Sequence, residues 1–459
     1  MSNLFLKLKS RLNAAPSSTD MTQGEPWKLL TSFALPVLFS QIFQQLYNTA
    51  DSLIVGRTLG MEALAAVSSS GTLIFLLVSF FNGTSMGAGV VVSKYFGAKD
   101  NDKISRAIHT NIVFSLLCGV VLTLVGVFLT PTFLVWMKTD PDVLPEAIEY
   151  FRYFFLGSLA MIMYNACRGI MSALGDSKRP LYYLIFSSLL NVALDVLFVA
   201  GFGWGVWSAA VATVLSQAAS VVLCLLHLLV KDQIYSVQLK KLRIDKAMLL
   251  EILRYGLPAG VQNSVIAFAN TIVQTQINSF GKYATAAYGT HGKIEGFAFL
   301  PIVSFNMAIS TFISQNLGAQ KYDRAKTGAR FGIVSALLLA ELIGIAMYLT
   351  MPQLASLFSR TPEVIALATR QARVITLFYC LLAYSHAVAS VCRGAGKAFV
   401  PMFIMLGVWC VLRICYIAYV SHTFGELSYI YWAYPITWAI SSVMYLIYYL
   451  KGDWIHGFD

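Results

Sequence analysis

Residues 107–129 read AIHTNIVFSLLCGVVLTLVGVFL, a stretch of 23 residues that contains no Asp, Glu, Lys or Arg. A helix needs about 20 predominantly apolar residues to cross the hydrocarbon core of a membrane. The runs of Leu, Val and Phe lack the alternation that is typical of a barrel strand, so the stretch predicts a transmembrane helix. The fold of this chain therefore has to place this segment in lipid.

The composition extends this prediction to the whole chain. Of its 459 residues, 57% are hydrophobic and only 12% are charged. Soluble chains carry about 45–50% apolar and about 25% charged residues. The balance excludes a disordered protein, a coiled coil and an ordinary cytosolic enzyme, and it favours a polytopic membrane protein.

Eleven further segments meet the same length and composition criterion, so we expect twelve transmembrane helices. The twelve segments are 29–55, 67–93, 107–129, 147–173, 181–200, 205–229, 250–279, 289–316, 328–350, 365–391, 400–420 and 428–450.

The positions of the basic residues predict the topology. The two tails and the loops after every second span hold 21 Lys and Arg, whereas the other six loops hold 4. Cytoplasmic loops are enriched in Lys and Arg, so both termini are expected in the cytoplasm. The net charge of +11 therefore reports membrane topology and not a nucleic-acid partner.

An internal repeat divides the chain into two similar halves. Leu35-Pro36 matches Leu257-Pro258 at an offset of 222 residues, and Gly175 and Pro180 match Gly396 and Pro401 at an offset of 221. Six spans return the chain to its starting side, so the two copies are expected to be parallel. The expected parts are a cytoplasmic tail at 1–28, an N-lobe at 29–229, a basic linker at 230–249, a C-lobe at 250–450 and a cytoplasmic tail at 451–459.

The fold class predicted from these patterns is an all-α membrane protein with two parallel six-helix bundles around a central cavity. Duplicated bundles of this kind suit alternating access, in which two lobes rock against each other around a central site. A receptor or an enzyme has no need of this symmetry.

Two acidic residues inside spans break the repeat. Asp51 in span 1 corresponds to Val273, and Asp195 in span 5 corresponds to Tyr416. An ionisable group at the centre of a span costs at least about 2.5–3.5 kcal/mol on insertion scales, so such residues are functional candidates. Both are expected in the outer half of the first lobe. The alternative is structural, with Asp51 hydrogen-bonded to Asn48 or to a kinked backbone and Asp195 at a helix interface.

Asn191 and Thr213 are expected near these acids. Asn191 lies four residues before Asp195 on the same helix face, and Thr213 lies about two turns into the returning span. Carboxylate, amide and hydroxyl oxygens together suit a hard cation such as Na⁺. Two close carboxylates also suit the loading and release of a proton. The residues leave the choice between H⁺ and Na⁺ open.

Lys293 and Glu295 are a second, weaker pair of candidates in span 8. Residues two apart on a helix do not face each other. They are candidates for substrate or proton handling, and the alternative places them at the end of the span, where charge costs less.

The combined pattern resembles the multidrug and toxic compound extrusion (MATE) family. The resemblance covers roughly residues 28–450. It rests on the two six-helix copies, the Leu-Pro entry into spans 1 and 7, Tyr47-Asn48-Thr49-Ala50-Asp51, the Gly-Ala-Lys/Gln ends of spans 2 and 8, and Arg-Gly-x-Gly-x-x-x-x-Pro at 393–401.

The resemblance implies export of organic cations in exchange for H⁺ or Na⁺. Asp51, Asn191, Asp195 and Thr213 match the spacing of the cation site in the prokaryotic branch that has this site in its N-terminal lobe. Pro36 matches a proline at which span 1 of that branch bends, and Gln44, Tyr47 and Asn165 match its cavity-lining positions. Spans 7 and 10 lack the acids of the other main branch, which disfavours a cation site in the C-lobe.

Several expectations complete this interpretation. The protein is expected to be no enzyme, to bind no cofactor besides the coupling ion, and to act as a monomer in a bacterial inner membrane. Its partners are expected to be cationic or amphipathic small molecules and membrane lipid. The alternative function is a flippase for lipid-linked oligosaccharide or another lipid-like substrate. A channel or an intramembrane enzyme is a further rival, although the sequence has no HExxH or GxSxG motif.

Overall fold

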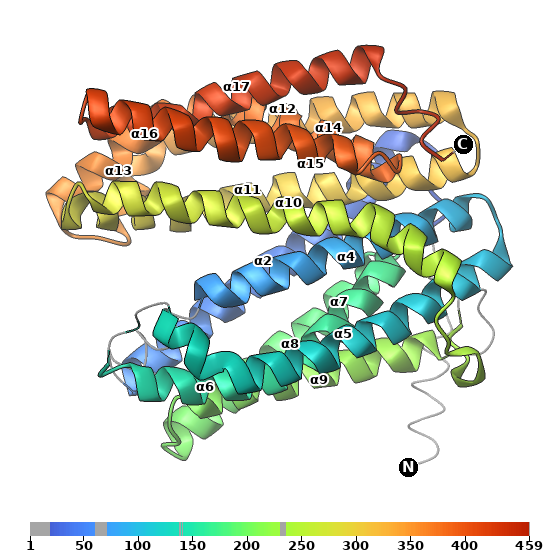
Figure 1. Ribbon diagram of the computed structural model, residues 1–459, viewed down its shortest axis with the longest axis horizontal. Helices are drawn as coiled ribbons and strands as arrows, with labels where there is room; N and C mark the ends of the chain where they lie inside the picture. The colour runs from blue at the N-terminus through green and yellow to red at the C-terminus, as the bar shows by residue number, and fades with distance from the viewer. Residues whose placement is uncertain (1–18, 60–70, 137–138, 140, 230–235, 459) are drawn as a thin grey trace. The chain divides into compact units, whose positions relative to one another are not determined.

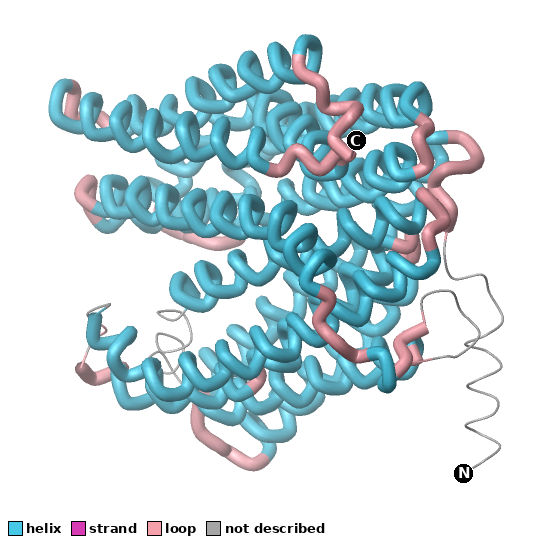
Figure 2. The backbone as a smooth tube through the Cα atoms, turned by 45° about the vertical axis from the view of Figure 1, so that its right-hand side comes forward, coloured by secondary structure: helices cyan, strands magenta, loops and turns pink. Residues whose placement is uncertain are grey.

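The computed structural model describes residues 19–59, 71–136, 139, 141–229 and 236–458. Every regular element within these ranges is helical (Figure 2). Parts of the expected tail and linker, residues 1–18 and 230–235, lie outside the described residues, as does the start of the second predicted span.

The described residues of the first half of the chain form seven α-helices and one short π-helix, along the path that Figure 1 shows. They are α2 (Pro26–Thr58), α4 (Gly71–Gly97), α5 (Asn101–Trp136), α6 (Leu144–Leu156), α7 (Ser158–Ala173), α8 (Lys178–Asp195), η1 (Val196–Gly201) and α9 (Trp207–Leu228).

The second half begins with a short linker turn and repeats the pattern (Figure 1). Its elements are η2 (Leu239–Lys241), α10 (Lys246–Asn278), α11 (Lys282–Gly318), α12 (Tyr322–Ser356), α13 (Pro362–Ile375), η3 (Thr376–Phe378), α14 (Tyr379–Gly394), α15 (Phe399–Met405), η4 (Leu406–Leu412), α16 (Arg413–Thr423) and α17 (Leu427–Lys451).

Each predicted span coincides with one helix or one run of consecutive helices. Within the described ranges, nine helical segments are long and apolar enough to cross a membrane, and the bent pair α6–α7 makes a tenth. α4 and α10 occupy the remaining two predicted spans and contain 27 and 33 residues. The prediction of an all-helical polytopic membrane protein is confirmed.

The fourth span differs from the expected single helix because it bends by 44° between α6 and α7. Gly157 lies at this break. A Cβ atom at this position would lie 2.2 Å from Cγ2 of Val214 in α9. The absent side chain therefore lets the bent span pack closely against its neighbour.

The backbone carries the same repeat as the sequence. Lys99 and Gln320 both adopt a positive φ, of 58° and 56°, directly after α4 and α11. Gly175 and Gly396 form a second such pair with φ of 81° and 76°. In each case a left-handed residue ends a helix with the hydrogen bonds of a Schellman motif.

The described residues gather into two compact units. The first contains the described parts of Phe39–Phe75 and Ser85–Leu253, and the second contains Gly24–Leu38, Leu76–Thr84 and the chain from Arg254 onward. In the first unit α5 packs on α6 and α7, and α9 packs on α6, α7 and α8. In the second unit the corresponding helices pack in the same pairs, α12 on α13 and α14, and α17 on α13, α14 and α16. The lobe boundaries expected from the sequence stay a prediction.

Candidate functional site

The two acids that break the repeat lie next to each other in the first unit. Asp195 is the last residue of α8 and is fully buried, and the π-helical turn η1 follows it directly. Asp51 projects from α2, and its carboxyl group is the neighbour of the Asp195 carboxyl group. The two residues are more than 140 positions apart in the chain, so only the tertiary fold brings their carboxyl groups together.

Three of the four carboxyl oxygens of this pair lack a hydrogen-bond donor among the described residues. Oδ1 of Asp51 and both carboxyl oxygens of Asp195 are buried and accept no hydrogen bond of good geometry from the described residues. A buried polar group without a partner costs free energy, and an ionised carboxylate costs the most. Two adjacent carboxylates are both acceptors, so neither can satisfy the other without a proton or a cation between them.

Asn191 and Thr213 extend the set of oxygens. Asn191 lies one turn before Asp195 in α8, and its Nδ2 donates to Oγ1 of Thr213 in α9 at 3.3 Å. This bond directs the amide nitrogen toward Thr213 and leaves Oδ1 of Asn191 buried and without a partner among the described residues. The sequence analysis placed Asn191 and Thr213 in one site, and the structure brings their side chains into direct contact.

Four further polar side chains lie near the acids or next to a residue that does. Tyr47, one turn before Asp51 in α2, lies beside Gln44 and Gln217 and within electrostatic range of both carboxyl groups. Tyr150 in α6 also lies within electrostatic range of the pair. The sequence analysis missed Gln217 and Tyr150. Gln217 follows Thr213 by four residues, which is the only signal that would have found it.

The arrangement suits a small hard cation or a proton. The buried atoms that have no hydrogen-bond partner among the described residues are carboxylate and amide oxygens, the ligands that such cations prefer. The described residues contain no group of three or more His, Cys, Asp or Glu side chains that could hold a metal ion. A transition-metal site therefore has no support within the described ranges.

The candidates in α11 lie in the second unit and have partners of their own. Glu295 accepts a hydrogen bond from Oη of Tyr379 at 3.0 Å. His291, one turn earlier, lies 3.9 Å from Glu295 and contacts Nε2 of Gln371 at 3.2 Å. Lys293 is exposed on another face, where its ammonium group lies 6.0 Å from the ring centre of Phe358. The structure thus separates Lys293 from Glu295.

Two candidates remain, Asn165 in α7 and Pro36 in α2. Nδ2 of Asn165 donates to the carbonyl oxygen of Met161 in its own helix α7 at 3.0 Å. Pro36 lies inside α2. It is two residues before the point where this helix passes from the second compact unit into the first.

Two other charged groups inside the second unit have interaction partners of their own. Oε2 of Glu341 in α12 accepts from the backbone nitrogen of Cys380 at 3.1 Å, just after the break η3. Arg413 is 2% exposed and donates to Oγ1 of Thr437 at 2.8 and 3.2 Å. Its guanidinium group also lies 4.7 Å from the ring centre of Tyr434.

Comparison with known proteins identifies relatives over nearly the whole chain. The MatE family model matches residues 36–197 and again residues 258–419, and the two matches start 222 residues apart. The chain is 30% identical to the probable multidrug resistance protein YoeA of Bacillus subtilis (strain 168), over 92% of this chain and 93% of that protein. It is 27% identical to the probable multidrug resistance protein YpnP of the same organism, over 95% and 97%.

A solved structure has the same fold. It is the outward-facing conformation of a multidrug resistance MATE family transporter of the MOP superfamily. It superposes with a TM-score of 0.89 at 21% identity, over 96% of this chain and 99% of that chain.

Proposed function

The chain belongs to the MatE family, the multidrug and toxic compound extrusion transporters, and on that premise we propose that it exports organic cations and drugs in exchange for H⁺ or Na⁺. The family is one of ion-coupled membrane transporters and not of enzymes. The names of YoeA and YpnP support drug-like substrates for this chain.

The coupling site in this proposal is the acid pair Asp51 and Asp195 with Asn191 and Thr213. The observation that carries it is the set of buried, partnerless oxygens on Asp51, Asn191 and Asp195. A proton shared by the carboxyl groups would turn one acceptor into a donor. A sodium ion would instead be held by the same oxygens, with Thr213 beside them.

The second lobe supports an assignment to the branch with its cation site in the N-lobe. Val273 and Tyr416 stand where the first copy has its two acids. Glu295 is the acidic candidate in the second lobe, and it already accepts a hydrogen bond from Tyr379. We therefore assign Glu295 and Lys293, with Gln44, Tyr47 and Asn165, to substrate handling and not to coupling.

The proposed cycle is alternating access. Loading of Asp51 and Asp195 from outside changes the hydrogen bonding around Asp51 and bends α2 at Pro36, where proline already removes one helical hydrogen bond. The bend reduces the space in the N-lobe and expels the substrate. One charge that crosses 100 mV supplies about 2.3 kcal/mol, which sustains an accumulation ratio of roughly 50-fold.

The remaining parts of the proposal concern location. We place the protein as a monomer in a bacterial inner membrane with both termini in the cytoplasm. The charge difference between alternate loops supports this orientation.

The test measures dye efflux from vesicles that contain the purified protein, with ΔpH and ΔNa⁺ imposed separately. Asp51→Asn and Asp195→Asn should each abolish efflux driven by either gradient, because an amide cannot load a proton or balance a cation. The wild-type protein should respond to one gradient, and this response identifies the coupling ion.

Glu341→Gln is the matched control, because it also changes an acid within a span to its amide. A Gln side chain still accepts the hydrogen bond from Cys380, so efflux should persist. Full gradient-driven efflux by Asp51→Asn would contradict the proposed coupling site. Binding of lipid-linked oligosaccharide without dye transport would instead favour the flippase.

A further inference from the structure

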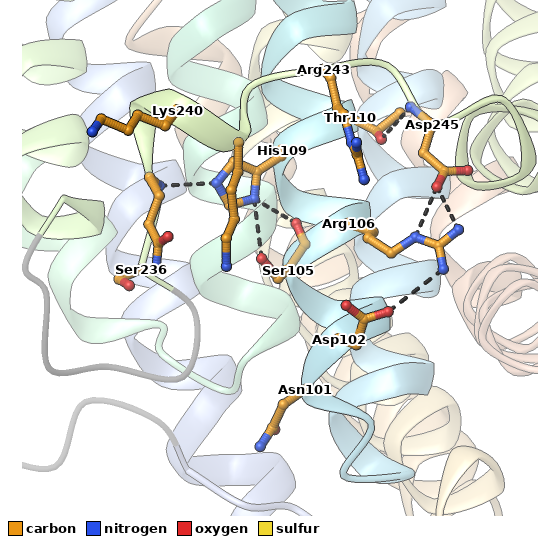
Figure 3. A pocket seen from close by; sticks show the side chains of 12 residues that line it. Asn101, Asp102, Ser105, Arg106, His109, Thr110, Ser236, Lys240, Arg243 and Asp245 are labelled. Carbon is orange, nitrogen blue, oxygen red and sulfur yellow. Dashed lines mark hydrogen bonds and ion pairs between the residues drawn. The ribbon is translucent and has the colours of Figure 1, made fainter.

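Residues 236–245 of the linker lie against the start of α5 and line a pocket with it (Figure 3). The cavity has a volume of about 530 Å³. Its walls are the first turns of α5 and the linker residues 236–245. The lining residues are Asn101, Asp102, Ser105, Arg106, His109, Thr110, Ser236, Gln238, Lys240, Lys241, Arg243 and Asp245.

Side chains of α5 hold the linker in place. Nε2 of His109 accepts from the backbone nitrogen of Gln238 at 2.9 Å, and Oγ1 of Thr110 accepts from the backbone nitrogen of Asp245 at 3.1 Å. Nε of Arg106 donates to Oδ2 of Asp245 at 2.8 Å. Because His109 accepts at Nε2 and contacts the carbonyl oxygen of Ser105 through Nδ1, it adds no charge to the pocket.

The pocket has an excess of cationic groups. Figure 3 shows the guanidinium group of Arg106 between Asp102 and Asp245, with which it forms ion pairs. Lys240, Lys241 and Arg243 are exposed. None of these three forms a salt bridge with the part of the chain that the structure describes. The two aspartates outweigh Arg106 by one negative charge, and the three exposed cations leave the lining with a net positive charge and are available to a ligand.

Exposed apolar side chains alternate with these cations. Leu239 is 70% exposed and precedes Lys240, and Ile244 is 36% exposed and follows Arg243. Val237 is buried, and its backbone nitrogen donates to the carbonyl oxygen of Leu228 at the end of α9. A segment anchored at the end of a membrane helix that presents Leu and Ile beside Lys and Arg has the composition of an interfacial membrane element.

We propose that this pocket binds the phosphate of an anionic phospholipid headgroup. Lys240, Lys241 and Arg243 contact the phosphate, and Leu239 and Ile244 lie against the upper acyl chains. Basic pockets at the cytoplasmic ends of transmembrane helices are suited to such headgroups. The exposed apolar residues favour a lipid over a soluble phosphate, which gains nothing from them. The site rests on the predicted cytoplasmic side of the linker and is independent of the acid pair.

The experiment measures the thermal unfolding temperature of the full-length protein in detergent while one lipid is titrated in. Phosphatidylglycerol should raise the temperature, and phosphatidylcholine with the same acyl chains should raise it less. Glycerol 3-phosphate, which has the phosphate without chains, should not raise it. In K240Q/K241Q/R243Q the half-saturating concentration of phosphatidylglycerol should rise roughly fivefold for each cation removed.

K28Q/K326Q/K451Q is the matched control, since it removes three exposed cations from the same predicted face of the membrane. It should keep the wild-type response to phosphatidylglycerol. Leu239→Ser with Ile244→Ser should weaken the response while it leaves the three cations in place.

Three results would overturn the proposal. They are equal stabilisation by phosphatidylcholine, equal stabilisation by glycerol 3-phosphate, and an equal loss of response in the control triple. The last result would mean that lipid binding depends only on the net charge of the protein and not on this pocket.

Discussion

Asp245 shows how one residue can join two parts of this protein. Its Oδ1 caps α10 by accepting from the backbone nitrogens of Ala247 and Met248 at 3.0 and 3.2 Å. Its Oδ2 accepts from Arg106 of α5. The hydrogen bond with Arg106 lowers the pKa of Asp245 below its usual 3.8, and the backbone N–H of Met248 adds to this effect. One carboxylate therefore fixes both the linker and the start of the second half.

We expect Asp245→Asn and Asp245→Ala to separate these two contacts. Asn still caps a helix, so Asp245→Asn loses only the ion pair, whereas Ala loses the cap as well, which costs about 1 kcal/mol. Hydrogen exchange of residues 236–248 should therefore accelerate more in Asp245→Ala than in Asp245→Asn. Equal exchange in the two variants would contradict the capping role.

The same carboxylate predicts an effect of pH on the linker. A group whose pKa is lower in the folded state stabilises that state above its unfolded pKa of about 3.9. This contribution is lost as the pH falls through the lower folded pKa. The protection of the linker amides in wild-type protein, corrected for the intrinsic exchange rate at each pH, should fall only below about pH 4, and Asp245→Asn should lack this acid-induced step.

At the residue scale, the comparison of the two copies selected candidates, whereas most contacts between helices had no signal in the sequence. Asp51 and Asp195 were selected because Val273 and Tyr416 replace them in the second copy, and their coupling role stays a prediction. Tyr150 lies near the same acids, but nothing in its own helix distinguishes it from a core tyrosine. Asn191 and Thr213 were placed in one site because they lie on adjacent helices joined by a short loop, and the structure adds a hydrogen bond between them.

At the scale of elements, the ends of the helices carry the duplication most clearly. Lys99 and Gln320 end α4 and α11 in the left-handed conformation, which disfavours residues with a Cβ atom by roughly 1–2 kcal/mol. Their backbone nitrogens donate to Phe96 and Leu317 in the same pattern. Both copies thus retain a turn for which glycine is the preferred residue.

Lys99→Gly and Gln320→Gly should each stabilise the protein by about 0.5–1 kcal/mol, because relief of the strain exceeds the added chain entropy of glycine. The measurement is thermal unfolding in detergent. Lys326→Gly, inside α12, is the control and should destabilise by about 1 kcal/mol. A lower unfolding temperature for Lys99→Gly would mean that its side chain makes contacts that outweigh the strain.

Breaks inside spans were beyond the sequence analysis. The π-helical turn η1 starts directly after Asp195, and π-helical turns are frequent at functional sites. The second copy has its π-helical segment η4 elsewhere, before Arg413. The residues 196–201 read as continuous apolar span, so hydropathy alone gives no sign of the changed hydrogen bonding.

At the scale of the whole molecule, the duplication fixes how the chain crosses the membrane. The MatE model matches both halves, and the helix pairs that pack within one unit also pack within the other. Two six-helix copies start on the same side, so the loops of the two halves that correspond should face the same compartment.

Cysteine labelling can test this orientation. In a chain without its seven native cysteines, a membrane-impermeant maleimide applied to intact cells should label Lys282→Cys. Lys326→Cys and Lys451→Cys should be labelled only in inverted vesicles, because they lie on the predicted cytoplasmic side. Labelling of Lys451→Cys from outside would contradict the predicted cytoplasmic C-terminus, and loss of external labelling of Lys282→Cys in the same experiment would mean that the whole orientation is inverted.

The sequence by itself determined the helical membrane fold, the twelve spans, the duplication and the two acids that break it. These properties depend on the length of apolar runs, the spacing of basic residues and the comparison of one half with the other, all of which are linear. The tertiary structure alone decided which polar groups meet: Tyr150 with the acid pair, Gln217 with Tyr47, Arg413 with Thr437, Glu341 with the backbone at Cys380, and the linker with α5. Such contacts depend on which faces of separate helices pack together, and a single sequence holds no local signal for that choice.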